Sequence, residues 1–67
     1  MTATQALRQA VGRAGLTGLK VEKLKIMTQP TYSRKIRAPS KLTIRELQML
    51  DKEAHFTDEE LRALIRG

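Results

Sequence analysis

The segment TQPTYSRKIR, from Thr28 to Arg37, concentrates side chains that donate hydrogen bonds. Arginine and lysine supply positive charge, glutamine supplies an amide, and serine and threonine supply hydroxyl groups, whereas the segment contains no acid. Such groups bind the phosphates of a polyanion, and arginine and glutamine also match the hydrogen-bonding edges of guanine and adenine. The chemistry that this segment favours is therefore recognition, with nucleic acid as the matching ligand.

No catalytic or metal-binding pattern is evident elsewhere in the 67-residue sequence. It contains no cysteine, and its one histidine, His55, has no second residue of the kind that a metal site needs. The acids Asp58, Glu59 and Glu60 fall in the first turn of a predicted helix, where the helix dipole favours negative charge. A chain this short also has little room for an enzyme cleft beside its core. We therefore expect a non-enzyme with no metal, cofactor or small-molecule ligand.

Positive charge is concentrated in the first part of the chain. Residues 1–41 contain nine lysines and arginines against one acid, Glu22, whereas residues 42–67 contain four bases and six acids, so the two parts carry +8 and −2 of the net +6. This segregation indicates a face suited to a polyanion. No apolar run reaches the length of a membrane span, and the N-terminus has no compact apolar signal-peptide core, so we expect a cytoplasmic protein.

A repeated threonine pattern marks the starts of helices. Four threonines have an apolar residue just before them and another four positions after them, which is a hydrophobic staple: Leu16 and Val21 around Thr17, Met27 and Tyr32 around Thr28, Leu42 and Leu47 around Thr43, and Phe56 and Leu61 around Thr57. Capping boxes are formed by Thr43 with Glu46 and Thr57 with Glu60, and a weaker one by Thr2 with Gln5. With apolar residues at helical spacing, these patterns predict helices over residues 3–14, 18–25, 29–36, 44–54 and 58–66.

The prediction is one compact all-α domain of five helices over residues 1–67. Gly15 ends the first helix because glycine accepts the left-handed conformation, and Pro39 disfavours helix in the residue before it. The predicted core consists of Leu7, Val11, Leu16, Val21, Leu24, Met27, Tyr32, Ile36, Leu42, Ile44, Leu47, Leu50, Phe56, Leu61, Leu64 and Ile65.

In the predicted helix 29–36, Tyr32 and Ile36 share one face, which we assign to the core. Packing explains Tyr32 better than base stacking, because single-strand binders need several exposed rings and Phe56 is the only other aromatic residue. The opposite side carries Pro30, Thr31, Arg34 and Arg37, with Ser33 beside them and Gln29 in the first turn. This outer surface has the side chains that a helix in the DNA major groove needs.

The helices 18–25 and 29–36 are joined by a very short turn, which is the arrangement of a helix-turn-helix. The chain resembles the lambda-repressor/Cro-like helix-turn-helix family, in particular its small prophage-type regulators. The matching motifs are GLT at the opening of the second helix, TQPTYSRKIR, PSKLTIRELQML and FTDEEL, and the resemblance extends over residues 7–65. The resemblance implies a five-helix domain that regulates transcription by binding specific double-stranded DNA, with helix 29–36 in the major groove.

The resemblance also implies roles for individual residues. The family places base contacts at the first and sixth residues of its recognition helix, which are Gln29 and Arg34 in this chain. Pro30, Thr31 and Ser33 are further expected base contacts from the same surface. Phosphate contacts are expected from Thr17, Lys20, Thr28, Lys35, Arg37 and Lys41.

A single helix-turn-helix buries little surface, so we expect a homodimer on a pseudo-palindromic operator. Leu61, Leu64 and Ile65 of the last helix are the expected dimer contacts. The chain ends soon after this helix, as in single-domain regulators, and the expected location is the nucleoid in a bacterial cytoplasm. Three alternatives stay open: a monomer that docks on another DNA-bound protein, a protein-binding adaptor of antirepressor or antitoxin type, and a binder of nucleic acid through charge alone.

The chain departs from the family's pattern around the turn. Glu22 follows Val21 where family members have alanine, and the turn contains no glycine. Two arrangements are compatible with this departure. Either the register shifts by one residue and Leu24 and Ile26 take the buried positions, or the turn is slightly longer.

Overall fold

The computed structural model describes residues 1–66, and over that range it is helical with no β-strand. Its helices are α1 (Ala3–Ala14), α2 (Gly18–Lys23), α3 (Gln29–Arg37), α4 (Ile44–Ala54) and α5 (Asp58–Arg66), and a short 3₁₀ helix, η1 (Pro39–Lys41), separates α3 from α4. The prediction of an all-α chain with five helices is confirmed, and the bounds of α1, α4 and α5 agree with it to the residue. No described helix has the length and apolarity that crossing a membrane requires.

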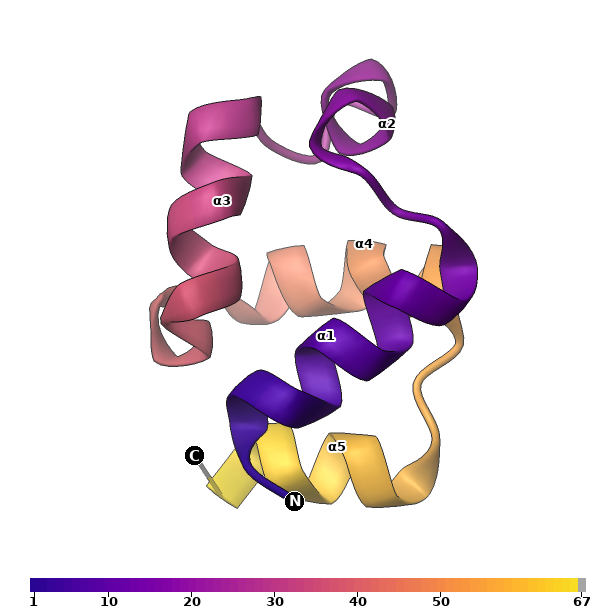
Figure 1. Ribbon diagram of the computed structural model, residues 1–67, viewed down its shortest axis with the longest axis vertical. Helices are drawn as coiled ribbons and strands as arrows, with labels where there is room; N and C mark the ends of the chain where they lie inside the picture. The colour runs from indigo at the N-terminus through magenta and orange to yellow at the C-terminus, as the bar shows by residue number, and fades with distance from the viewer. Residues whose placement is uncertain (67) are drawn as a thin grey trace.

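Helix α1 lies at the centre of the arrangement. It packs against α5, α4 and α3, whereas α2 packs against α3 at the end of the molecule away from α5 (Figure 1). Figure 1 looks almost along the axis of α2 and side-on at α3, so these two helices cross steeply. Ala6 and Ala10, both fully buried, give α1 a narrow inner face. Such small side chains allow neighbouring helices to approach closely.

One continuous core connects these helices. Its buried members are Leu7, Ala10, Leu16, Val21, Tyr32, Leu50, Ala54 and Phe56. The residues of the four predicted staples either belong to this core or pack against it. The predicted capping boxes are confirmed as well: in each of the pairs Thr2–Gln5, Thr43–Glu46 and Thr57–Glu60, two reciprocal hydrogen bonds of 2.8–3.1 Å are formed.

Glu60 has a second role beside capping α5. Its side chain is fully buried, and its two carboxylate oxygens accept hydrogen bonds from Arg13 at 2.8 and 2.9 Å and from Gln9 at 2.9 Å. The hydrogen bonds from Arg13 outweigh the opposing effect of burial and lower the pKa of Glu60 from 4.5 to about 2. This ion pair ties α5 to α1. The sequence prediction explained Glu60 by the capping box with Thr57 and by the helix dipole, and it missed the partner on α1.

Two predicted helix ends are wrong. Helix α2 ends at Lys23 rather than Lys25, because Lys25 adopts a left-handed conformation with φ of 60°. The backbone N–H groups of Lys25 and Ile26 then donate back to the carbonyl oxygens of Glu22 and Val21, which is a Schellman motif.

Helix α3 runs to Arg37, one residue beyond the predicted end. Proline restricts only the residue directly before it. That residue is Ala38, whose φ of −134° and ψ of 75° lie outside the helical region.

Three predicted core residues are wrong, because Leu24, Ile44 and Ile65 are 39%, 72% and 81% exposed. Their apolar character does not determine the side of the helix on which they lie. Alanines occupy much of the core instead, and the buried ones that the predicted core omitted are Ala3, Ala6, Ala10 and Ala54. Val21 is fully buried and Leu24 is 39% exposed, so Leu24 does not take the buried position that the register shift would give it.

Candidate nucleic-acid interface

The inner side of α3 is fixed to the rest of the protein by Tyr32. Its ring is 6% exposed, and its hydroxyl donates a 2.6 Å hydrogen bond to the carbonyl oxygen of Leu16. Burial raises the pKa of Tyr32 above its ordinary value. The expectation that Tyr32 packs in the core is confirmed. Because Ile36 also packs against the core, the orientation of α3 about its own axis is set.

The outer side of α3 follows from that orientation. Arg34 lies two residues after Tyr32 and two before Ile36, which on a helix places it opposite both. Arg34 and Pro30, one turn apart, are both exposed. Thr31 is half-buried on one flank, where its hydroxyl lies 3.5 Å from the guanidinium of Arg34. The predicted base contacts on this side are thus accessible together.

The other flank of α3 borders a groove of about 400 Å³. Gln29, Ser33 and Arg37, spaced one turn apart, line its α3 side, while Arg8 of α1 and Gly18 of α2 line the facing side. The groove therefore has an arginine from each of two helices together with an amide and a hydroxyl group. The sequence prediction did not include Arg8. The only feature of the sequence that could have indicated Arg8 is its position on α1, opposite the apolar face of that helix.

The expected phosphate contacts differ in their surroundings. Thr17 caps α2, because its hydroxyl oxygen accepts a 3.2 Å hydrogen bond from the backbone N–H of Lys20. Both residues are exposed at the start of α2, and Lys41 is exposed in η1.

Lys35 is held within the protein. Its ammonium lies 2.6 and 2.7 Å from the two carboxylate oxygens of Glu46 on α4. Burial raises the pKa of Glu46, but hydrogen bonds from Lys35 and Thr43 together bring it below its ordinary value. This geometry gives the expected phosphate contact of Lys35 no support.

The start of α3 is not capped as expected. Thr28 has the extended backbone of a capping residue, but its hydroxyl accepts no hydrogen bond from a backbone N–H of α3. It donates instead to the side-chain hydroxyl of Thr31 at 2.9 Å. The first N–H of α3, that of Gln29, instead points to the carboxylate of Glu22 at 3.4 Å. The side-chain amide of Gln29 donates to the same carboxylate at 3.2 Å.

The charge of the first part of the chain is largely exposed. Of its nine bases, Arg13 and Lys35 pair with Glu60 and Glu46 of the second part. The other seven are all exposed: Arg8, Lys20, Lys23, Lys25, Arg34, Arg37 and Lys41. They belong to α1, α2, α3 and the segments next to them. Within residues 1–66, the acids of α4 and α5 thus pair with only two of these nine bases, and the other seven stay at the surface.

The expected dimer contacts are divided between the core and the surface. Leu61 and Leu64 are half-buried and pack against the core, whereas Ile65 is 81% exposed. Only Ile65 is therefore fully available to a second molecule.

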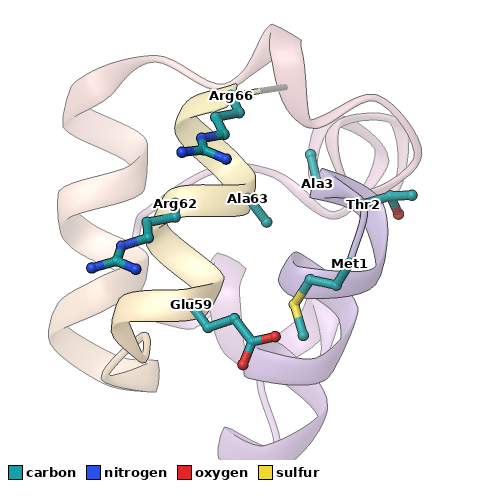
Figure 2. Close-up of a pocket in the computed structure, with 7 residues that line it drawn as sticks. All are labelled: Met1, Thr2, Ala3, Glu59, Arg62, Ala63 and Arg66. Atoms are coloured by element: carbon teal, nitrogen blue, oxygen red, sulfur yellow. The ribbon is translucent and has the colours of Figure 1, made fainter.

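A second cleft, of about 440 Å³, lies between the N-terminal residues and α5. In Figure 2, Glu59 extends toward Met1, whereas Arg62 and Arg66 extend away from the N-terminal segment. These side chains include no nucleophile next to a base. Within residues 1–66, no group of three or more histidine, cysteine or acidic residues is placed to hold a metal ion.

Comparison of this chain with known protein families, curated proteins and solved structures gives no match.

Proposed function

We propose that this protein is a sequence-specific double-stranded DNA-binding regulator of transcription, of the lambda-repressor/Cro-like helix-turn-helix type, with α3 as its recognition helix. The observation that carries the proposal is the two-sided character of α3. Tyr32 and Ile36 anchor one side in the core, and the opposite side presents Pro30 and Arg34. Gln29 and Ser33 are exposed on the flank that borders the groove. An α-helix fits the major groove, where arginine pairs with guanine and glutamine with adenine.

The surroundings of α3 support the same proposal. Helix α2 crosses α3 across a turn formed by residues 24–28, as the first helix of a helix-turn-helix does when it crosses the DNA backbone. Thr17 and Lys20 at its start, Arg8 and Arg37 beside the groove, and Lys41 beyond α3 provide exposed donors for phosphates. Phosphate contacts of this kind set the position of a protein on DNA, and base contacts set its sequence preference.

Binding as a homodimer to a pseudo-palindromic site is part of the proposal. One recognition helix contacts few base pairs, and two copies related by a two-fold axis double the contacts. Of the three expected dimer contacts in α5, Ile65 is the one that is exposed and can contribute to the contact between copies.

The test is a selection of binding sites from random DNA, followed by titration of the enriched and the random sequences at two salt concentrations. We expect an enriched motif with two related half-sites. Specific complexes typically bind roughly 10³-fold or more tightly than random DNA. Equal affinity for all sequences, falling steeply with salt, would replace this function with binding through charge alone. No binding to DNA would favour a protein-binding adaptor.

A further inference from the structure

Glu22 occupies an unexpected place on the cationic surface. It is the one acid among residues 1–41, and it lies exposed on α2 next to the first residue of α3. Its two carboxylate oxygens accept hydrogen bonds from two groups of the same residue, the backbone N–H of Gln29 at 3.4 Å and the side-chain amide at 3.2 Å. A carboxylate is well placed there, because the first N–H groups of a helix lack partners and the helix dipole attracts negative charge.

Gln29 is also confined from a second direction. A β-carbon placed on Gly18 would lie 3.4 Å from the Cγ atom of Gln29, so the glutamine side chain rests over the start of α2. Glu22 thus holds the amide of Gln29, and the aliphatic part of the glutamine lies beside Gly18. The two contacts join α2 to α3 at the point where α3 begins.

The chemistry of the amide shows what this contact leaves free. A glutamine amide has two N–H hydrogens and a carbonyl oxygen. When one hydrogen is donated to Glu22, the other hydrogen and the oxygen stay available. Those two groups are the donor and acceptor that pair with the major-groove edge of adenine.

We propose that Glu22 is a positioning residue for base recognition, which holds the Gln29 amide ready to read one base pair. This inference rests on the proposed function of α3. Holding the amide before DNA binds removes part of the entropy loss of ordering it in the complex. The negative charge of Glu22 also disfavours close approach of phosphates whatever the sequence. The first effect increases the difference in affinity between the specific site and other DNA. The second effect lowers the affinity for all DNA by a similar factor.

Three variants separate the two effects. Glu22→Ala removes the contact and the charge, whereas Glu22→Gln removes the charge but keeps an oxygen that accepts from Gln29. Glu59→Gln is the matched control, because it makes the same change in net charge at an exposed position on α5. Each variant is measured by site selection from random DNA and by titration against random DNA. Nuclear magnetic resonance relaxation of the Gln29 side-chain amide is recorded in the free protein.

We expect Glu22→Ala to lower the preference at one base pair per half-site by roughly 2- to 10-fold, the effect of having to immobilise one side chain on binding. Its Gln29 amide should become more mobile in the free protein. Glu22→Gln should retain that preference while binding random DNA more tightly than the wild type, and Glu59→Gln should change neither property.

A Glu22→Ala variant with the base preference of the wild type, or with an equally ordered Gln29 amide, would overturn the inference and leave the proposed function intact. A wild-type protein without any base preference would overturn both. The wild-type selection therefore distinguishes the two failures.

Discussion

The hydroxyl of Tyr32 donates a 2.6 Å hydrogen bond to the carbonyl oxygen of Leu16, and this bond connects α3 to the segment between α1 and α2. The bond is buried, and the ring around it is part of the core. A helix held in this way presents its outer side chains in one fixed direction. Reading a base sequence depends on that property, because hydrogen bonds to base edges need defined geometry.

Tyr32→Phe should destabilise the protein while keeping its fold. The ring still fills its place, but the buried carbonyl of Leu16 loses its partner, which costs about 1–3 kcal/mol. Urea unfolding of the two proteins measures the difference. Tyr32→Ala should destabilise the protein more than Tyr32→Phe does, by about 3–5 kcal/mol, because it also leaves a cavity. A Tyr32→Phe variant as stable as the wild type would show that the hydrogen bond does not help to hold α3.

Acid should destabilise the protein through Glu60. Its pKa is about 2 in the folded protein and near the ordinary value of about 4.3 in the unfolded chain. A carboxyl group whose pKa is lower in the folded state stabilises the fold at pH values above its unfolded-state pKa. The free energy of unfolding should therefore decrease as the pH falls from about 4.5 toward 2. Glu46, whose pKa is also lowered, acts in the same direction.

Glu60→Gln should remove most of this dependence. The variant cannot form the ion pair with Arg13, so it should be less stable at neutral pH and change less between pH 5 and pH 2. Urea unfolding at a series of pH values compares the two proteins. Parallel curves for the two proteins would mean that Glu60 does not carry the acid sensitivity.

Arg8→Ala should weaken binding to all DNA sequences by a similar factor. Arg8 lies across the groove from Ser33 and Arg37 and so can reach a phosphate beside α3. Loss of one phosphate contact should reduce the slope of log affinity against log salt by about 1. Lys52→Ala is the control, because it removes the same charge from an exposed position on α4. If both variants changed the slope equally, the effect would come from net charge rather than from the groove.

Ile65→Glu should separate folding from dimer formation. Ile65 is 81% exposed, and substitution at such a position usually changes stability by no more than about 0.5 kcal/mol. We expect the variant to unfold like the wild type but to bind a site with two half-sites less tightly. Analytical ultracentrifugation with DNA measures the stoichiometry. Two copies of Ile65→Glu bound with wild-type affinity would exclude α5 as the dimer contact.

The helices could be predicted because their signals are local. Threonine and the residue three positions later form the boxes that begin α1, α4 and α5, and the staple residues lie close by in the sequence. The end of α2 was predicted less well. A lysine, Lys25, takes the left-handed conformation that is usually adopted by glycine, and no residue type in the turn signals it.

Contacts between residues far apart in the sequence could not be predicted from local sequence patterns. Arg13 and Glu60 are 47 positions apart in the sequence, and each also fits a solvated helix face. The outer surface of α3 could be predicted, because the spacing of Tyr32 and Ile36 fixes it. The groove with Arg8 and the contact between Glu22 and Gln29 could not, because they depend on how α1 and α2 are placed against α3.

The most direct test of the central claim compares Arg34→Ala with Lys41→Ala by site selection and titration. Arg34 lies opposite the buried side of α3, and Lys41 lies beyond the helix in η1. We expect Arg34→Ala to lose about 1–3 kcal/mol of discrimination at one base pair of each half-site. Lys41→Ala should weaken all sequences alike. Two variants with the same uniform loss of affinity would contradict the assignment of α3 as the helix that reads DNA.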